Sequence, residues 1–151
     1  ASALKSMEKK VERAIQQGAR LLCGGHRIGT KGYFFEPTVL DCVTQKMDII
    51  QEETFGHILP VVEYSDINDA IAWANDCEYG LTSSVYTQNL DNAFKVMRSL
   101  KFGETYINRE NFEAMQGFHA GWRKSGIGGA DGKHGLEEYL QTQVVYLETK
   151  E

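Results

Sequence analysis

The segment 51–60 holds the residue types in this chain that are best suited to bind a nucleotide. Adjacent carboxylates are followed directly by an aromatic side chain and a glycine. Because successive side chains of an extended segment point to opposite sides, Glu53 and Phe55 can face the same way. A carboxylate accepts hydrogen bonds from ribose hydroxyls, and an aromatic ring packs flat against a planar heterocycle. Two interpretations are open at this point. The segment binds a nucleotide, with Gly56 allowing close approach of the backbone, or it is a solvated pair of glutamates beside a ring that fills the core.

The remaining residues that could do chemistry form no recognisable site by their spacing. The histidines lack the i,i+3 or i,i+4 spacing of metal ligands on a helix, so no metal site is predicted. The cysteines lack CxxC spacing and a nucleophile motif, so each is expected to be buried or a reduced surface thiol, and no catalytic residue is predicted. The glycines between 126 and 135 do not match GxGxxG and are expected in tight turns beside a helix. The histidines and cysteines are His26, His57, His119, His134, Cys23, Cys42 and Cys77.

The composition and charge are those of an ordinary globular domain. Of the 151 residues, 42% are apolar and 25% are charged, which argues against disorder. The net charge of −5 gives no reason to expect a nucleic-acid or anionic-membrane partner, and no apolar run is long enough to span a membrane. Reduced cysteines favour a cytoplasmic protein. The chain starts directly with an amphipathic helix and has no initiator methionine, so we expect it to be a piece of a longer protein.

The first part of the chain is predicted to contain a helix followed by short extended segments. Apolar residues at helical spacing are followed by Gly18, which is suited to a helix C-terminus. Pro37 favours a strand edge or a bend. The expected elements are a helix at 3–17, strands at 20–23 and 58–62, the latter buried, an extended segment at 33–42 and irregular chain at 48–56.

Residues 58–108 contain two strand–helix–strand units in succession. Ser65-Asp66 and Asn89 can cap two helices whose apolar residues recur at helical spacing. Strands are expected before, between and after these helices. Consecutive units of this kind predict one parallel sheet, and therefore an α/β fold. The expected strands are 58–62, 82–86 and 104–108.

The periodicity stops after Asn108. Residues 109–130 are polar, aromatic and rich in glycine, and are too long for an ordinary connection, so we expect a functional loop. A short helix at 133–140 and a strand at 142–147 should follow. Because a charged tail comes directly after it, this strand is expected at a sheet edge or paired with another chain.

Several short motifs occur in order along the chain. They are Glu52-Glu53-Thr54-Phe55-Gly56, Tyr79-Gly80-Leu81-Thr82, Gly103 to Asn108, Gly121-Trp122-Arg123-Lys124-Ser125-Gly126 and Gly135-Leu136. This ordered set resembles the C-terminal third of NAD(P)-dependent aldehyde dehydrogenases, over essentially the whole chain. The set is far more specific than any one of its motifs.

The resemblance implies a fold and a division of the chain. Residues 1–140 would form the parallel-sheet half of the family's α/β catalytic domain, and residues 141–151 an oligomerisation strand and tail. The glycine-rich cofactor loop, the catalytic cysteine and the glutamate base lie upstream in that family, so this piece alone should be inactive. We therefore expect it to associate with the upstream half of its own chain and to form a homo-oligomer. The alternative is a stand-alone, non-catalytic binding or assembly module of the same fold.

The resemblance also implies which residues bind ligands. Glu53 would hold the nicotinamide ribose, and Phe55 would pack beside the nicotinamide ring of NAD, or of NADP. The loop that contains Glu113 and His119 is similar to that of members oxidising small hydroxyaldehydes, lactaldehyde or glycolaldehyde. His119-Ala120 stands in place of the usual Phe-Gly, which points to a changed substrate pocket. The alternative roles are a surface carboxylate for Glu113 and a loop-stabilising imidazole for His119.

Overall fold

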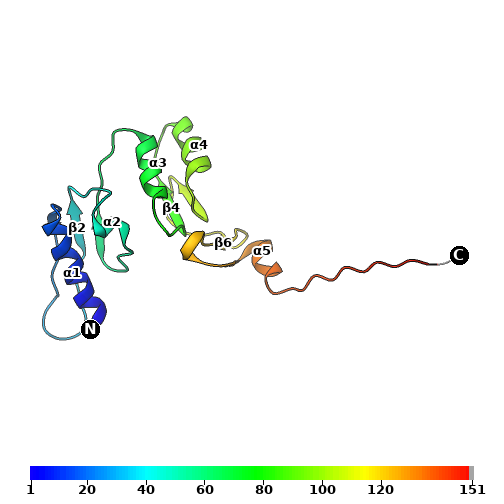
Figure 1. Cartoon of the computed structure of the whole chain (residues 1–151), viewed down its shortest axis with the longest axis horizontal. Helices are drawn as coiled ribbons and strands as arrows, with labels where there is room; N and C mark the ends of the chain where they lie inside the picture. Colours follow the sequence, from blue (N-terminus) through cyan, green and yellow to red (C-terminus); the bar gives the residue numbers. More distant parts are fainter. Residues whose placement is uncertain (150–151) are drawn as a thin grey trace. The chain divides into compact units, whose positions relative to one another are not determined.

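The computed structural model describes residues 1–149. The chain divides into two compact units, Ala1–Asp69 and a second unit that begins at Ala70, each with its own helices and strands (Figure 1). Within the described part of the chain, none of the helices combines the length and the apolar character needed to span a lipid bilayer.

Helix α1 (Ser2–Gln16) opens the first unit and ends in a Schellman-type turn. Gly18 has a φ of +108°, and the amides of residues 18 and 19 donate to carbonyls of the last helical turn at 3.0 and 2.9 Å. The helix expected over 3–17 is therefore confirmed, together with the role of Gly18 at its end.

The first sheet has the strand order β1–β2–β3. Its strands are β1 (Arg20–Cys23), β2 (Thr38–Asp41) and β3 (Ile58–Pro60). β1 is antiparallel to β2, and β2 is parallel to β3. The strand expected at 20–23 is confirmed, whereas only part of the extended segment 33–42 pairs as a strand. The connection from β2 to β3 contains the short helix α2 (Asp48–Gln51), so the prediction of irregular chain at 48–56 was wrong for 48–51 and is confirmed for 52–56.

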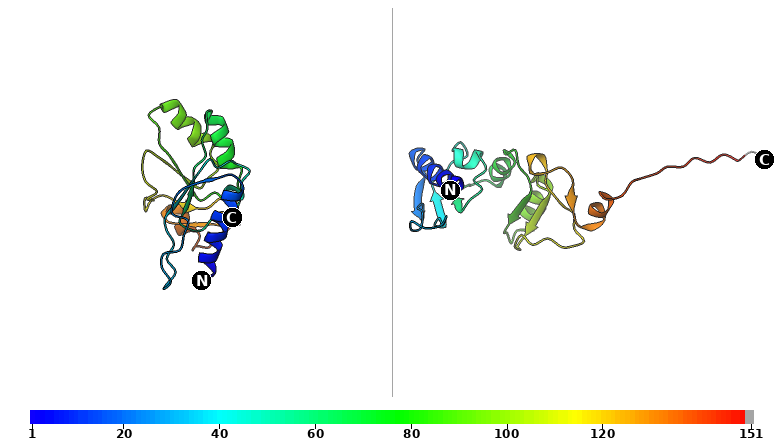
Figure 2. Two further views of the ribbon diagram at one scale, coloured as in Figure 1. Left: turned by 90° about the vertical axis from the view of Figure 1, so that its left-hand side faces the viewer. Right: turned by 90° about the horizontal axis from the view of Figure 1, so that it is seen from below.

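Both helices of this unit pack against the sheet, and Figure 2 shows α1 lying along it. Leu40 of β2 is completely buried at the centre of the core. β3 is less buried than predicted, because Leu59 is 60% exposed. The core residues are Leu4, Val11, Ala14, Ala19, Phe35, Leu40, Val43, Met47, Ile49 and Ile58.

The second unit is built on one β–α–β unit. Strands β4 (Thr82–Val85) and β5 (Glu104–Ile107) pair in parallel and are connected through α4 (Leu90–Ser99). Asn89 caps α4 as predicted, since its side chain accepts a hydrogen bond from the amide of Asn92 at 3.0 Å. Helix α3 (Ile67–Asn75) precedes β4.

The single parallel sheet predicted for 58–108 is not formed. β4 and β5 make the expected parallel pair, but β3 pairs with β2 and belongs to a different sheet. The periodicity identified the strands correctly, whereas the pairing of β3 depends on β2, which is contributed by an earlier part of the chain.

The segment expected to be a long loop contains short regular pieces. They are β6 (His119–Ala120), the 3-10 helix η1 (Arg123–Ser125) and β7 (Gly129–Ala130), with β6 and β7 antiparallel. Helix α5 (Gly132–Glu137) follows and is shorter than the predicted 133–140. The glycines occupy tight turns and close contacts, as predicted: Gly128 and Gly132 have positive φ, and a Cβ on Gly129 would lie 2.4 Å from the His119 carbonyl oxygen.

The strand predicted at 142–147 is absent from the structure of the single chain. Residues 141–149 have no regular secondary structure and extend away from α5 (Figures 1 and 2). A β-strand requires a hydrogen-bonded neighbour, and no described strand pairs with this segment. Its four consecutive apolar side chains are 67–94% exposed.

Candidate functional site

The candidate cofactor motif follows the end of α2 in the first unit. Phe55 has a φ of +46°, in the left-handed region, so the segment is not the regular extended chain from which we expected Glu53 and Phe55 to face the same way. The ring of Phe55 is 89% exposed, which excludes the alternative that it fills the core of this unit. Glu53 is also exposed, and its carboxylate has no hydrogen-bond or ion-pair partner among residues 1–149. Both side chains are thus available to a ligand.

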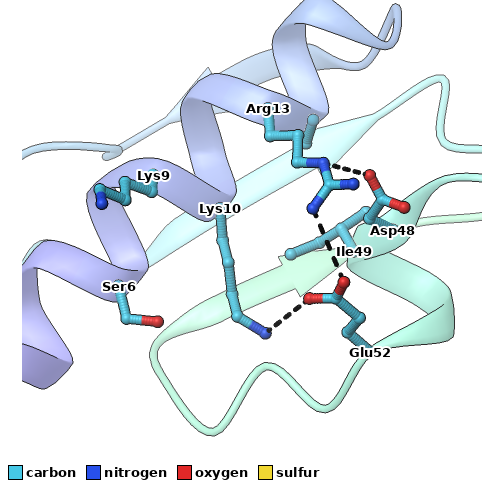
Figure 3. A pocket seen from close by; sticks show the side chains of 8 residues that line it. Ser6, Lys9, Lys10, Arg13, Asp48, Ile49 and Glu52 are labelled. Carbon is cyan, nitrogen blue, oxygen red and sulfur yellow. Dashed lines mark ion pairs between the residues drawn. The ribbon is translucent and has the colours of Figure 1, made fainter.

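Helix α1 holds this motif through charged side chains (Figure 3). Arg13 pairs with Asp48 and, at 3.6 Å, with Glu52, while Lys10 lies 3.9 Å from the Glu52 carboxylate. The Lys10 ammonium also donates to the backbone carbonyl of Glu53. The adjacent glutamates therefore differ: Glu52 is tied to α1, whereas only the backbone of Glu53 is held.

Gly56 allows the motif to approach α1 closely. A Cβ at this position would lie 2.5 Å from the sulfur of Met7. Met7, Lys10 and Arg13 are three residues apart along α1, so one side of the helix contacts the motif. We expected Gly56 to permit close approach to a ligand. In the structure, Gly56 permits close approach to α1.

The second unit brings His119 against Glu104. The Nδ1 atom of His119 lies 2.9 Å from Oε2 of Glu104, and the hydroxyl of Tyr106 donates to the same oxygen at 3.0 Å. Glu104 and Tyr106 share one face of β5 because they are two residues apart. The Glu104 side chain is 14% exposed and that of His119 32% exposed, so the imidazole stays accessible while the carboxylate is largely enclosed.

The charges around this cluster favour the protonated imidazole. The hydrogen bond from His119 to Glu104 raises the pKa of His119, and the negative charges of Glu104, Glu113 and Asp131 raise it further against the opposing effect of burial. Burial and the bond to Glu104 raise the pKa of the Tyr106 hydroxyl. Tyr106 therefore acts as a neutral donor near pH 7.

Glu113 lies on a loop that is attached to the chain directly after β4. Asn108 anchors the start of the loop, since its side chain accepts from the Thr87 amide at 2.8 Å and donates to the Thr87 carbonyl at 2.7 Å. The hydroxyl of Tyr86 donates to the carbonyl of Arg109 at 3.1 Å. The Glu113 carboxylate is exposed and forms no hydrogen bond or ion pair among the described residues, but its charge contributes to the raised pKa of His119.

Two of the ordered motifs bind each other in this unit. The amide of Gly80 donates to Oγ of Ser125 at 2.8 Å, and the amide of Trp122 donates to the Gly80 carbonyl at 2.9 Å. The Arg123 guanidinium donates to the Lys101 carbonyl at 2.9 Å. These bonds fix the chain directly after β6 and thereby help to place His119.

Sequence reasoning identified His119 but missed its partners. The alternation of β5 places Glu104 and Tyr106 on one face, but only the folded chain shows that His119 approaches that face. Lys10 and Arg13 were likewise missed, although their spacing along α1 was visible. Residues 1–149 contain no group of three or more side chains that could hold a metal ion.

The chain has an α/β fold, with an exposed carboxylate–aromatic motif in one unit and an accessible imidazole in the other. These features agree with the class of protein that the ordered motifs indicate. The chain belongs to the aldehyde dehydrogenase family, whose model matches residues 1–145. Lactaldehyde dehydrogenase from Escherichia coli (strain K12) is 66% identical over 149 residues, which are 99% of this chain and 31% of that protein.

Solved structures agree with this assignment. The crystal structure of lactaldehyde dehydrogenase from Escherichia coli matches with a TM-score of 0.95 and 65% identity, over 99% of this chain and 31% of that one. The NAD⁺ complex of an aldehyde dehydrogenase from Bacillus cereus matches with a TM-score of 0.92 and 34% identity, over 99% of this chain and 30% of that one. The expected fold class is confirmed, and the chain spans less than a third of the length of these relatives.

Proposed function

We propose that the chain is the C-terminal part of an NAD-dependent aldehyde dehydrogenase that oxidises a small hydroxyaldehyde, lactaldehyde or glycolaldehyde, to the acid. The observation that carries this proposal is the accessible His119 imidazole, held by Glu104 and close enough to Glu113 to be influenced by its charge. The 66% identity to a lactaldehyde dehydrogenase supports it. We further propose a cytoplasmic homo-oligomer in which this chain associates with the upstream half of its own protein.

Glu53 and Phe55 fit the nicotinamide half of the cofactor. The Glu53 carboxylate is exposed and without a partner among the described residues, so it can accept hydrogen bonds from ribose hydroxyls. The exposed ring of Phe55 offers a flat apolar surface beside the nicotinamide. Bound NAD supplies the acceptor for the hydride. This half is identical in NADP, so these residues do not select between the two cofactors, which differ at the adenosine ribose.

Glu113 and His119 are proposed to recognise the 2-hydroxyl group of the substrate. Glu113 can accept a hydrogen bond from this hydroxyl, and His119 can accept or donate one. A pocket built to pair with a hydroxyl discriminates strongly against the analogue that lacks it, because the polar groups of the pocket are then left unpaired. Hydroxyaldehydes should therefore be preferred over propanal and acetaldehyde.

The test uses the full-length protein that contains this chain. His119→Phe or Glu113→Leu should lower the ratio of kcat/KM for lactaldehyde to that for propanal by on the order of tenfold, because one lost hydrogen bond costs about 1 kcal/mol or more. The matched control is Glu110→Leu, which removes an exposed carboxylate of the same loop and should leave the ratio unchanged. An unchanged ratio in both site variants would assign Glu113 and His119 to structure.

A second assay, on the isolated chain, tests the division of labour between this chain and the upstream half. The isolated 151-residue chain should show no turnover of glycolaldehyde with NAD, because we expect the nucleophile to come from the upstream half. Cys23, Cys42 and Cys77 are exposed free thiols, and none lies in a nucleophile motif. Turnover by the isolated chain that disappears on changing one of these cysteines would refute the division of labour proposed here.

A further inference from the structure

The Glu104 carboxylate is fixed from two sides in the second unit. Oε2 accepts from the Tyr106 hydroxyl at 3.0 Å and lies 2.9 Å from Nδ1 of His119. Tyr106 is 8% exposed, and its neighbour on β5, Glu104, is 14% exposed at the side chain. The carboxylate therefore has little freedom to move away from the imidazole.

This contact determines which ring nitrogen of His119 carries the proton. An ionised carboxylate can only accept hydrogen bonds, so Nδ1 must be the donor. In the neutral imidazole, Nε2 is then the acceptor. Nε2 has no partner among residues 1–149, and the side chain is 32% exposed.

We propose that Glu104 is a positioning residue for substrate recognition: it fixes the orientation and the tautomer of His119, so that Nε2 is presented to the hydroxyl of a 2-hydroxyaldehyde. This inference rests on the proposed role of His119 in the function above. Glu104 itself does not touch the substrate. Its effect is exerted through the imidazole, in the manner of carboxylates that hold functional histidines in one tautomer.

Glu104 also sets the pH range in which Nε2 is an acceptor. The groups that face His119 are Glu104 on β5, Glu113 on the preceding loop and Asp131 before α5, and all three raise its pKa. Below the raised pKa, Nε2 carries a proton and becomes a donor. Above it, Nε2 accepts. Removing the Glu104 charge should lower the pKa of His119, so that the acceptor form persists to lower pH.

The experiment measures the ratio of kcat/KM for lactaldehyde to that for propanal as a function of pH in the full-length protein. The variants are Glu104→Gln, which keeps size and polarity but removes the charge, and Tyr106→Phe, which removes the other hydrogen bond to the same oxygen. His119→Phe identifies the inflection that belongs to His119. Thermal unfolding is followed for each variant.

Glu104→Gln is expected to reduce the ratio several-fold at neutral pH and to move the His119 inflection to lower pH. Tyr106→Phe keeps the Glu104 charge and its bond to His119, so it should lose thermal stability and lower the ratio less than Glu104→Gln does, without moving the His119 inflection to lower pH. If Glu104→Gln lowers kcat/KM equally for both aldehydes and leaves the His119 inflection unmoved, Glu104 is merely structural and the inference is overturned.

The His119 and Glu104 variants distinguish failure of the inference from failure of the proposed function. If His119→Phe lowers the ratio and Glu104→Gln does not, the inference about Glu104 is wrong while the proposed substrate role of His119 stands. If His119→Phe leaves the ratio unchanged, the substrate role of His119 is wrong, and the inference falls with it.

Discussion

Phe55 combines an exposed ring with an unusual backbone. A bulky residue at a φ of +46° is uncommon, and such strain persists only where the surrounding structure holds it. Here the preceding residues are held to α1 by Lys10 and Arg13. A ring that is 89% exposed gains little from packing within its own unit, which supports a role in binding a ligand.

The roles of the adjacent glutamates can be separated in the full-length protein. A charge-assisted hydrogen bond contributes roughly 1.5–3 kcal/mol and a neutral one about 1, so Glu53→Gln should slow hydride transfer by on the order of tenfold. The measurement is single-turnover NADH formation, with the covalent thiol step followed separately and expected to change less. Glu52→Gln is the comparison: it weakens ion pairs to α1 but keeps the proposed ribose acceptor, so it should slow single-turnover hydride transfer at saturating NAD less than Glu53→Gln does. Equal rates in Glu53→Gln and the wild type would show that Glu53 does not position the cofactor.

At the scale of elements, α1 is the support of the cofactor motif. A Cβ on residue 56 would lie 2.5 Å from the sulfur of Met7. Lys10 and Arg13 bind the chain on either side of Glu52. A helix that is anchored in the core through Leu4, Val11 and Ala14 thus presents its other side to the motif. The position of the Glu53 backbone depends on this helix.

Lys10→Met tests this support, since it keeps a long apolar stem and removes the ammonium. We expect a loss of about 1 kcal/mol or less in unfolding free energy, because the ion pair is partly exposed. The KM for NAD should rise, because the carbonyl of Glu53 loses its donor. Lys9→Met is the control: Lys9 lines the same pocket and forms no ion pair there (Figure 3). If both variants raise the KM equally, general charge at this surface is responsible instead of support of the motif.

The elements were more predictable than their pairing. Gly18 and Asn89 marked helix ends correctly because capping is a local property of a few residues. The pairing of β3 with β2 and the approach of His119 to Glu104 join distant parts of the chain, and no local pattern encodes them. The left-handed Phe55 was missed because an aromatic residue normally avoids that conformation.

At the scale of the whole molecule, much apolar surface is exposed in both units. Leu22 and Leu59 in the first unit and Tyr86 in the second are 54%, 60% and 70% exposed. Where exposed apolar side chains form a contiguous patch, the patch normally marks a surface that contacts other protein. Because the chain spans 31% of the length of the lactaldehyde dehydrogenase that it matches, we propose that the upstream half of the protein covers part of this surface.

The segment 142–147 adds to this exposed apolar surface. It carries Val144, Val145, Tyr146 and Leu147, which are 67–94% exposed, and it has no strand partner among residues 1–149. An exposed apolar segment with unpaired backbone groups readily pairs with a strand of another chain. The resemblance to the family implies that this pairing occurs between subunits, and we retain that as a proposal.

Truncation tests the proposal directly. Deleting residues 141–151 from the full-length protein removes the apolar run together with its backbone donors and acceptors, so sedimentation velocity should show a smaller species than the wild type. Deleting only 148–151 removes charged residues, keeps the apolar run and should leave the assembly intact. Circular dichroism of both truncated proteins establishes that the remaining domain is folded, because an unfolded chain would also change its sedimentation. A folded protein that lacks 141–151 and still sediments like the wild type would show that the subunits associate through another surface.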